Sequence, residues 1–241
     1  MYYFKTFIKS VIRSLGFDLH RLNPASNPSY QLLMALNRFD IDLVLDVGAN
    51  VGQFASEIRS VGYKGELVSF EPLSSAHKAL VKAAEHDPKW QVHPRCAIGD
   101  YDGEIEINIA GNSVSSSILP MMETHSSAVE ASVYVGRERV PIRKLDSVAP
   151  PYLANARKPF LKMDTQGFES KVLDGAAQIL SLIKGIQCEM SLVLLYDGQK
   201  LWMDMIHRLE NDGFTLWSIQ KSFTDPRDGR MLQIDAIFFR L

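Results

Sequence analysis

Four carboxylates stand at or near the ends of apolar, strand-like runs, where α/β proteins place many reactive side chains. Asp46 closes LVLD, Glu71 follows the run that ends in SF, Asp164 closes FLKMD and Glu189 lies in GIQCEM. If these runs pair in parallel, their carboxyl ends meet at one edge of a sheet, beside a ligand crevice. Carboxylates at such an edge can accept hydrogen bonds from hydroxyls, pair with a cation or accept a proton.

The turn that follows Asp46 limits the choice of ligand. In LVLDVGANVGQF, Gly48 allows a tight turn with close backbone approach, and Gly52 lets a helix begin near the ligand. A dinucleotide fingerprint would require glycine at the positions of Asn50 and Gln53, and the Gly-Lys-Ser/Thr ending of a phosphate loop is absent. The turn is therefore poorly suited to a pyrophosphate, and an NAD-dependent oxidoreductase is disfavoured.

Glu71, in the segment SFEP, is a second indication of the ligand. A carboxylate at a strand end about 20 residues after such a turn can accept hydrogen bonds from both ribose hydroxyls. A nucleoside without phosphates is favoured, and S-adenosylmethionine fits, with its ammonium group meeting Asp46 directly or through water. A lone glycine turn also joins many strands to helices without binding anything. It is the combination of the turn with Glu71 that predicts the cofactor.

Methyl transfer from a sulfonium is an in-line displacement, so the acceptor hydroxyl must be aligned and must lose its proton. Asp164 is the leading candidate for the base, Glu189 is beside it, and His125 ranks lower because a polar loop is not a rigid platform. Asp164 could instead cap the helix that follows it, and Glu189 could pair with a lysine. Asp164 and Glu189 could also hold a divalent cation such as magnesium, although their spacing does not establish a metal site.

The elements that must position these residues follow a regular order. Strand-like runs alternate with helical patterns, which predicts βαβ units in a Rossmann-like, doubly wound, mostly parallel sheet of seven strands. The last two strands are joined only by the turn-rich KSFTDPRDGR, which predicts a terminal antiparallel hairpin. The expected strands are 42–46, 66–70, 90–95, 159–163, 185–190, 214–219 and 233–239, and the expected helices are 29–38, 51–61, 74–85, 168–182 and 199–211.

The segment 103–141 interrupts this alternation. It has the pattern of strands around a polar loop with no clear helix, and we expect a β-rich insertion or lid over the ligand site. Its hydroxyl and amide side chains suit a sugar acceptor, although a flexible polar loop is equally consistent with them. Tyr196, in YDGQ, could also face the acceptor, or could belong to a simple turn. The candidate acceptor contacts in the loop are Asn112, Ser115, Ser116 and Ser117.

Several ordered motifs give the chain a resemblance to a known family. DVGANVGQFA, SFEP and AIGDYDGEIEI are followed by VPIRKLDSV, by FLKMDTQGFESKVLDGA and by CEMSLVLLYDGQ. From about residue 43 to about residue 220 the chain resembles the FkbM-type methyltransferases of the class I S-adenosylmethionine-dependent fold, and the LKMDTQGFE block with its later YDGQ is the most specific part. The resemblance implies O-methyl transfer, commonly onto sugar hydroxyls of glycans or onto natural-product scaffolds.

The motif positions of the family can be matched to individual residues of this sequence. Thr165 stands where a small aliphatic residue is usual and Met163 precedes the aspartate, but neither departure removes a charged or polar group. Glu169 suits the first turn of the following helix. The cofactor motifs are matched by Asp46, Gly48, Ala49, Asn50, Gly52, Glu71, Pro72, Ala97 and Ile98. The block after the fourth strand is matched by Asp164, Gln166, Gly167 and Glu169, with Gln166 as a candidate substrate contact.

Composition places few further limits. The 241 residues suit one large α/β domain, expected over 41–241 after an N-terminal helical extension over 1–40. A formal net charge of -2 supplies no basic field for nucleic acid. Cys96 and Cys188 are too few for a disulfide framework and are expected to be buried, inert thiols in a reducing cytosol. No apolar run approaches the ~20 residues of a membrane-spanning helix.

The N-terminal segment has the pattern of an amphipathic helix that is too often interrupted by charge for a signal peptide. Lys5, Lys9 and Arg13 form a basic edge beside an apolar stripe. Such a helix could pack on the domain, on a second copy of the chain in a homodimer, or on an anionic membrane surface as a peripheral contact of a cytoplasmic protein. The stripe consists of Phe4, Phe7, Ile8, Val11, Ile12 and Leu15.

These observations converge on one expectation and leave alternatives open. The main expectation is an S-adenosylmethionine-dependent O-methyltransferase acting on a hydroxyl of a sugar, a glycan or a glycosylated metabolite. Methylation of a polyketide or another small natural product is the nearest alternative. A catalytically idle scaffold with the same fold is a further one, which the presence of Asp46, Glu71 and Asp164 disfavours.

Overall fold

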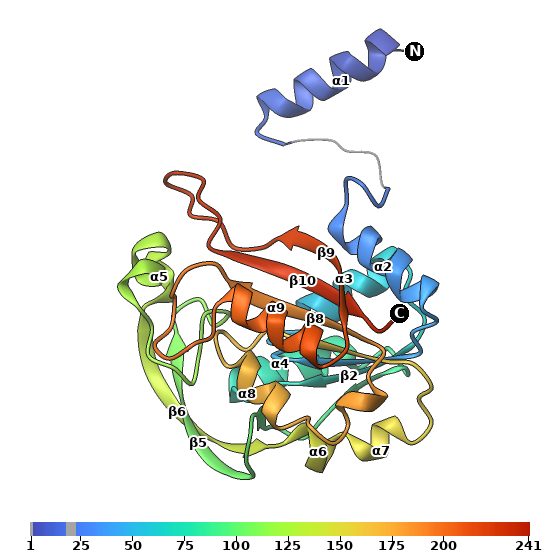
Figure 1. Ribbon diagram of the computed structural model, residues 1–241. Helices are drawn as coiled ribbons and strands as arrows, with labels where there is room; N and C mark the ends of the chain where they lie inside the picture. Colours follow the sequence, from blue (N-terminus) through green and yellow to red (C-terminus); the bar gives the residue numbers. More distant parts are fainter. Residues whose placement is uncertain (1, 18–22) are drawn as a thin grey trace.

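A seven-stranded sheet forms the centre of the computed structural model, which describes residues 2–17 and 23–241 (Figure 1). The strand order is β3-β2-β1-β7-β8-β10-β9, every pair from β3 to β8 is parallel, and β10 is antiparallel to both of its neighbours. The predicted fold class and terminal hairpin are thereby confirmed. The strands are β1 (Leu43–Val47), β2 (Glu66–Phe70), β3 (Trp90–Val92), β7 (Pro159–Met163), β8 (Gly185–Ser191), β9 (Thr215–Lys221) and β10 (Gln233–Phe239).

Helices cover both faces of this sheet, so the core has two layers. One apolar cluster joins the sheet to three helices, and a second cluster joins the opposite face to the other helices of the domain. Because both faces are covered, β1 and β7 are buried at every position. The first face carries α2 (Pro28–Arg38), α3 (Gln53–Val61) and α4 (Ser74–Ala84), and the second carries α6 (Leu145–Val148), α7 (Pro150–Leu153), α8 (Glu169–Asp174) and α9 (Trp202–Asn211).

Charged side chains interrupt the apolar pattern of the two central strands. Asp46 in β1 and Lys162 in β7 are Cα partners in the parallel ladder, so both side chains point to the same face. That is the face covered by α2 and α3, because the neighbouring residues Val44 and Phe160, two positions earlier, belong to its apolar cluster. A charge in a buried strand must be paired, and this register supplies the partner.

A second, smaller sheet lies beside the main one, in the order β4-β6-β5 (Figure 1). It contains β4 (Ala97–Ile98), β5 (Gly103–Ala110) and β6 (Tyr134–Arg143), of which β5 and most of β6 lie in the segment 103–141. The prediction of no helix in 103–141 was wrong, because α5 (Glu123–Ala128) and a 3-10 turn, η1 (Glu130–Ser132), connect the strands. The short helix depends on tertiary contacts: His125 packs against the rings of Tyr196 and Phe223, which sequence periodicity does not show.

The predicted helix over 168–182 was too long. It is divided into α8, which ends at Asp174, and a 3-10 turn, η2 (Leu180–Leu182). Gly175 follows α8, and a Cβ at this glycine would lie 1.8 Å from the carbonyl oxygen of Gly99. The close passage of the chain at Gly99 therefore stops the helix there, and helical periodicity alone does not contain that contact.

The N-terminal helix α1 (Tyr2–Ser14) stands apart from the sheet and its helices in Figure 1. Its described side chains are exposed or half-buried, including Phe7 at 67% exposure, and Leu15 just beyond its end is 69% exposed. Among the described residues, no helix is both long and apolar enough to span a bilayer.

Candidate active site

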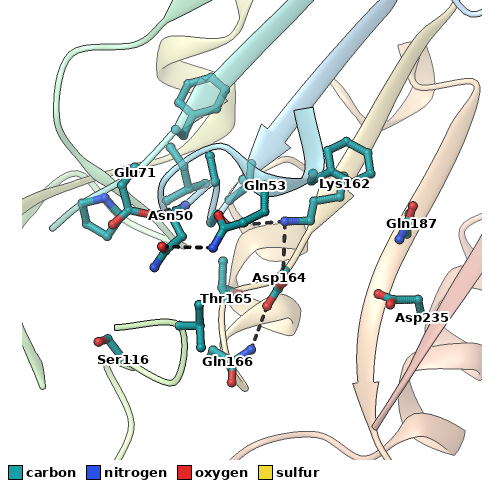
Figure 2. Close-up of a pocket in the computed structure, with 18 of the residues that line it drawn as sticks. Asn50, Gln53, Glu71, Ser116, Lys162, Asp164, Thr165, Gln166, Gln187 and Asp235 are labelled. Atoms are coloured by element: carbon teal, nitrogen blue, oxygen red, sulfur yellow. Dashed lines mark hydrogen bonds and ion pairs between the residues drawn. The ribbon is translucent and has the colours of Figure 1, made fainter. Parts of the chain in front are cut away.

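One cavity of about 450 Å³ opens at the carboxyl ends of β1, β2 and β7. Figure 2 shows its polar side chains in two groups, with Glu71 and Asn50 on one side and Gln187 and Asp235 on the other. The Glu71 half is lined by Gly48, Ala49, Asn50, Glu71, Pro72, Leu73, Cys96, Ala97, Ile98, Ile107, Ser113 and Ser116. The Asp235 half is lined by Ser29, Leu32, Phe54, Glu57, Ile58, Lys162, Gln187, Gln220, Lys221 and Asp235, and Gln53, Asp164, Thr165 and Gln166 stand between the halves.

Gly48 lets the ends of β1 and β7 meet beneath the cavity. Its φ is +78°, and a Cβ there would lie 1.8 Å from the carbonyl oxygen of Asp164. The backbone N–H of Asp164 donates to the carbonyl of Val47 at 3.1 Å. The glycine therefore positions the strand that carries Asp164, in addition to turning the chain toward α3.

Glu71 forms a carboxylate cradle with backbone donors on both oxygens. The N–H of Asn50 donates to Oε2 at 2.8 Å, and that of Leu73 donates to Oε1 at 2.9 Å. Burial raises the pKa of Glu71 to about 7, against the opposing effect of these two N–H groups. Each carboxylate oxygen retains a further acceptor position, so the cradle can still accept two hydroxyl donors from a ligand in the cavity.

Asp46 lies beneath the cavity and does not line it. Its carboxylate is fully buried and pairs with Lys162, whose Nζ is 3.1 Å from Oδ1, while the hydroxyl of Ser69 donates to Oδ2 at 3.2 Å. Gly52 also lies outside the lining, at the start of α3, where a Cβ would contact the ring of Trp90 at 2.8 Å. These two motif residues therefore support the turn from below.

Lys162 joins the two halves of the cavity. Its Nζ donates to the carbonyl of Gly48 at 3.3 Å and lies 3.7 Å from Oδ2 of Asp164, besides its contact with Asp46. Burial by itself would lower the pKa of this lysine, but the charges of Asp46 and Asp164 outweigh burial, so its pKa is raised. Lys162 therefore stays protonated and balances the carboxylates around it.

Asp164 presents a half-buried carboxylate to the cavity. It follows β7, its side chain is 35% exposed, and its Oδ1 accepts a hydrogen bond from Nε2 of Gln166 at 2.8 Å. The same nitrogen donates to Oε2 of Glu189 at 2.7 Å, and the hydroxyl of Tyr196 donates to Oε1 of Gln166 at 2.8 Å. Because both amide hydrogens of Gln166 are used, this residue is committed to orienting the two carboxylates.

Glu169 holds the turn that carries Gln166. Its Oε1 accepts from the N–H groups of Thr165 at 2.7 Å and Gly167 at 3.2 Å. Gln166 and Gly167 have φ values of +53° and +95°, which side chains other than glycine rarely adopt. Burial raises the pKa of Glu169 to about 6. The TQGFE segment is thus a turn whose backbone is held by a buried carboxyl.

Glu189 does not reach the cavity lining. Its Oε2 also accepts from Nε2 of Gln233 at 2.7 Å, and its Oε1 accepts from the hydroxyl of Ser222 at 3.2 Å. Burial, and then the charge of Asp164, raise the pKa of Glu189 well above its ordinary value. Glu189 is therefore a buried carboxyl that accepts hydrogen bonds from three side chains behind the cavity.

The carboxylate pair does not fit a magnesium ion in this arrangement. The N–H donors of Gln166 occupy the space between Asp164 and Glu189, where a cation would need oxygen ligands. Among the described residues, no three His, Cys, Asp or Glu side chains are grouped to hold a metal.

The loop that contains Asn112 and the serines at 113 and 115–117, here called the serine-rich loop, lies against the Glu71 half and is hydrogen-bonded to residues of the site at two points. Nδ2 of Asn50 donates to Oγ of Ser113 at 3.4 Å, and the hydroxyl of Ser117 donates to the carbonyl of Gln166 at 2.7 Å. Ser116 and Ser117 line the cavity, whereas the side chains of Asn112 and Ser115 bond to each other at 3.0 Å. The structure thus brings two of the four predicted loop residues to the site.

Two further predicted residues lie behind the cavity wall. Tyr196 is fully buried and its hydroxyl also lies 3.1 Å from the carbonyl of Ser115. His125 is 3% exposed, and burial lowers its pKa to about 4. Its ring packs on Tyr196 with centroids 5.1 Å apart. His125 is therefore a neutral residue that supports Tyr196.

Both cysteines are buried, free thiols, as expected. Burial raises the pKa of Cys96 to about 11 and that of Cys188 well above its ordinary value. Cys96 lines the Glu71 half as an apolar side chain beside Ala97 and Ile98. Neither thiol is activated as a nucleophile.

A protein-family model described as the methyltransferase FkbM domain matches residues 46–216. The match includes Asp46, the Glu71 cradle, Asp164 and the turn at Gln166. The chain belongs to the FkbM methyltransferase family. No curated protein sequence gives a significant match to this FkbM methyltransferase.

Solved structures with similar folds are distant in sequence. Magnesium protoporphyrin IX methyltransferase from Synechocystis is 11% identical, with 98% of this chain and 97% of that chain covered and a TM-score of 0.49. The 1,6-didemethyltoxoflavin N1-methyltransferase of Burkholderia thailandensis is 12% identical, with coverage of 89% and 77% and a TM-score of 0.49. An rRNA methylase of Streptococcus thermophilus is 9% identical, with coverage of 92% and 99% and a TM-score of 0.47.

Among the polar lining residues that sequence reasoning missed, Lys162, Gln187 and Asp235 come from three strands of the main sheet and line the Asp235 half. A signal for them was present, because each interrupts a buried strand, in PFLKM, GIQCEMS and QIDAIFF. Burial, and then the charge of Asp164, raise the pKa of Asp235 to about 6, while Lys162 opposes the shift. A polar residue in a buried strand is thus a candidate site residue even outside a motif.

Proposed function

We propose that this FkbM methyltransferase transfers the methyl group of S-adenosylmethionine to a hydroxyl of a sugar, a glycan or a glycosylated metabolite. The observation that carries the proposal is the position of Asp164 in one continuous cavity, between the Glu71 cradle and the polar Asp235 half. Methyl transfer to a hydroxyl requires a site for the methyl donor, a site for the acceptor, and a base located between them.

The Glu71 half has the chemistry of a nucleoside site. The free acceptor positions of Glu71 suit two ribose hydroxyls. The apolar surface of Cys96, Ala97 and Ile98 beside it suits adenine. When bound, S-adenosylmethionine supplies an electrophilic methyl group on a sulfonium sulfur.

The aminoacyl end of the cofactor would lie over the glycine turn, toward Asp164. The carbonyl of Gly48 and the carboxylate of Asp164 are the acceptors there that could meet an ammonium group. Asp46 acts from beneath, because its charge is paired with Lys162 and its side chain is covered.

Asp164 is the base in the proposed reaction. Its carboxylate accepts the proton of the acceptor hydroxyl while the oxygen–methyl bond forms and the sulfur–methyl bond breaks in line, with the bonding pair staying on sulfur. Gln166 fixes the orientation of the carboxylate, and the ammonium group of Lys162 lies 3.7 Å from its Oδ2. Glu189 and His125 take no proton from the acceptor in this scheme, because neither side chain lines the cavity.

The test is methyl transfer from isotopically labelled S-adenosylmethionine to a panel of sugars, methyl glycosides and polyketide-type alcohols, with products identified by mass spectrometry. We expect a methyl ether on a sugar hydroxyl, together with a raised melting temperature in S-adenosylhomocysteine but not in NAD. Labelling of polyketide alcohols alone would overturn the acceptor class. No thermal shift with the cofactor product would overturn the cofactor assignment.

We also propose that α1 lies on an anionic membrane surface, so that the enzyme works as a peripheral protein on the cytoplasmic side. Phe7 and Val11 are exposed along α1 and Leu15 is exposed just beyond its end, while Lys9 and Arg13 suit anionic headgroups. Flotation with vesicles that contain phosphatidylserine tests this. Phe7→Glu with Leu15→Glu should abolish flotation, and added salt should weaken it; unchanged flotation would contradict the proposal.

A further inference from the structure

We propose that the Asp235 half is the acceptor site and that it takes a neutral sugar ring through two adjacent hydroxyls. Gln187 and Asp235 accept hydrogen bonds from these hydroxyls, and the ring of Phe54 contacts the apolar face of the sugar. The inference rests on the proposed function and names the subsite and the ligand chemistry for it.

The strand order places the Asp235 half beyond the reach of the cofactor. From β2, which carries Glu71 at its end, to β10, which carries Asp235, the sheet has four strand spacings, about 19 Å. In the proposed pose the methionine chain runs from the ribose at Glu71 over the glycine turn to Asp164, which is two of these spacings, from β2 past β1 to β7. A cofactor anchored at Glu71 therefore ends near Asp164 on β7, and the space next to β8 and β10 stays free for a second ligand.

The side-chain oxygen of Gln187, Oε1, is an unused hydrogen-bond acceptor that indicates a ligand. Its side chain is 6% exposed and lines the cavity, and its Oε1 has no hydrogen-bond partner among the described residues. Buried side-chain oxygens are nearly always hydrogen-bonded. The atom that completes Gln187 must be a donor, as a hydroxyl of an acceptor molecule is.

Carboxylates add further acceptors to this half, in Asp235 and Glu57. Asp235 stands beside Gln187 (Figure 2), and its pKa of about 6 leaves it ionised at neutral pH. Of the two lysines in this half, Lys162 is engaged by Asp46, by Asp164 and by the carbonyl of Gly48, whereas Lys221 is exposed at the end of β9. A ligand that supplies two O–H donors matches this pair, whereas a phosphate or carboxylate ligand would meet a carboxylate.

An apolar surface faces this polar edge. The ring of Phe54 is held under Nζ of Lys162 at 5.3 Å, and Leu32 and Ile58 continue the apolar surface in the same half. A sugar ring has the same two-sided character, with hydroxyls at its edge and C–H groups on its faces. Apolar walls with a few placed polar groups are typical of small-ligand sites.

The outer end of this half is closed by side-chain contacts that fix α2 to the sheet. Nε2 of Gln220 donates to the carbonyl of Pro28 and to Oε1 of Gln31, both at 2.9 Å. The hydroxyl of Ser29 bonds to the carboxylate of Glu57. The space beside Gln187 and Asp235 is therefore bounded, which suits a single ring at this position.

The test measures binding separately from turnover. Protein saturated with S-adenosylhomocysteine is titrated with a panel of methyl pyranosides, followed by saturation-transfer NMR. Gln187→Leu and Asp235→Asn should each weaken binding of the best glycoside about tenfold, the effect of losing one hydrogen bond to a buried group. The affinity for S-adenosylhomocysteine, which also reports folding, should stay within about twofold because these residues lie outside the Glu71 half.

Matched controls and analogues make the assignment specific. Gln178→Leu and Asp204→Asn, at exposed positions, should leave glycoside binding unchanged. A deoxy glycoside without the hydroxyl that meets Gln187 should bind wild type weakly and lose nothing more in Gln187→Leu. Tighter binding of an amino sugar than of its hydroxyl analogue would overturn the diol in favour of a cation.

The outcomes also separate this inference from the proposed function. Methylated glycosides whose binding is unaffected by Gln187→Leu and Asp235→Asn would overturn the acceptor site and leave the proposed function standing. Glycoside contacts that map to the serine-rich loop would do the same. If no glycoside in the panel binds or is methylated, the proposed acceptor class and this inference both fail.

Discussion

The two halves of the cavity are built in different ways. The carboxylate cradle of the Glu71 half comes from two segments that are close in sequence, the glycine turn and SFEP, and its donors are backbone N–H groups. The Asp235 half takes single side chains from α2, α3 and β7 to β10, from Ser29 to Asp235 along the sequence. A site made from a local backbone shape serves a constant ligand, whereas one made from scattered side chains can change its ligand by substitution.

Lys162 and Asp164 stand where the two halves meet. Gly48 lets the strand that carries both residues approach the turn, and Lys162 balances the charge of Asp46 on one side and Asp164 on the other. The comparison therefore predicts that changes to the turn damage the whole site. Changes in the Asp235 half should affect the acceptor alone.

Gly48→Ala should have the largest effect, because a Cβ there would lie 1.8 Å from the carbonyl oxygen of Asp164. We expect a loss of more than about 4 kcal/mol in the free energy of unfolding, measured by urea denaturation. Gly198→Ala is the control: its φ is +76° but nothing lies within 4 Å of the place that its Cβ would take, so only about 1–2 kcal/mol of backbone strain is expected. Equal losses in the two variants would contradict the role given to Gly48.

Lys162→Met should cost about 3–5 kcal/mol of stability, because it leaves the fully buried carboxylate of Asp46 without its cation. Denaturation in urea measures the loss. Adding Asp46→Asn should restore part of the stability, since the uncompensated charge is then removed. If the double variant is no more stable than Lys162→Met, the ion pair is not what joins the two halves.

Asp164→Asn should lower turnover ~10²–10⁴-fold if this residue is the base. Cofactor binding, measured by calorimetry, should weaken far less than turnover, because Glu71 and the glycine turn are intact and Asp164 is only one of the two acceptors offered to the ammonium group. Asp204→Asn, on the exposed surface of α9, is the matched control. Near-normal turnover in Asp164→Asn would move the proton transfer to another group.

Cofactor binding should weaken as the pH falls through the pKa of Glu71, about 7. The ionised carboxylate accepts the ribose hydroxyls, so ionisation above this pKa favours binding and protonation below it opposes binding. From pH 8 to pH 6 we expect the dissociation constant of S-adenosylhomocysteine to rise about tenfold, as one proton linked to binding requires. Glu71→Gln should bind weakly at both pH values, and an unchanged slope in this variant would assign the titration elsewhere.

Much of the cofactor half could be predicted because its signals are local. Gly48, Asn50 and Glu71 lie within one strand–turn–helix–strand unit, whose spacing follows from the geometry of the fold. The position of Asp164 could be predicted for the same reason, since parallel strands end at a common edge. The burial of Asp46 under the turn could not, because it depends on Lys162 in a strand more than 100 residues later.

His125 and the serine-rich loop show the opposite case. A histidine among serines suggests an exposed, polar segment, yet the ring is enclosed by Tyr196 and Phe223. Asn112 and Ser115 have the side chains that suit a sugar but use them on each other. The residue type determines which interactions a side chain can make, and the packing of the fold determines the partner with which it makes them.

By itself the sequence determined the alternation of strands and helices, the family, and the residues of the glycine turn. Periodicity and motif spacing depend only on residues that are close together in the sequence. Tertiary structure alone decided that Lys162, Gln187 and Asp235 face one space, that Gln166 links Asp164 to Glu189, and that α5 exists. The physical reason is that strand pairing brings distant residues within contact distance. The register that aligns their side chains on one face follows from the whole fold and is not contained in any one segment.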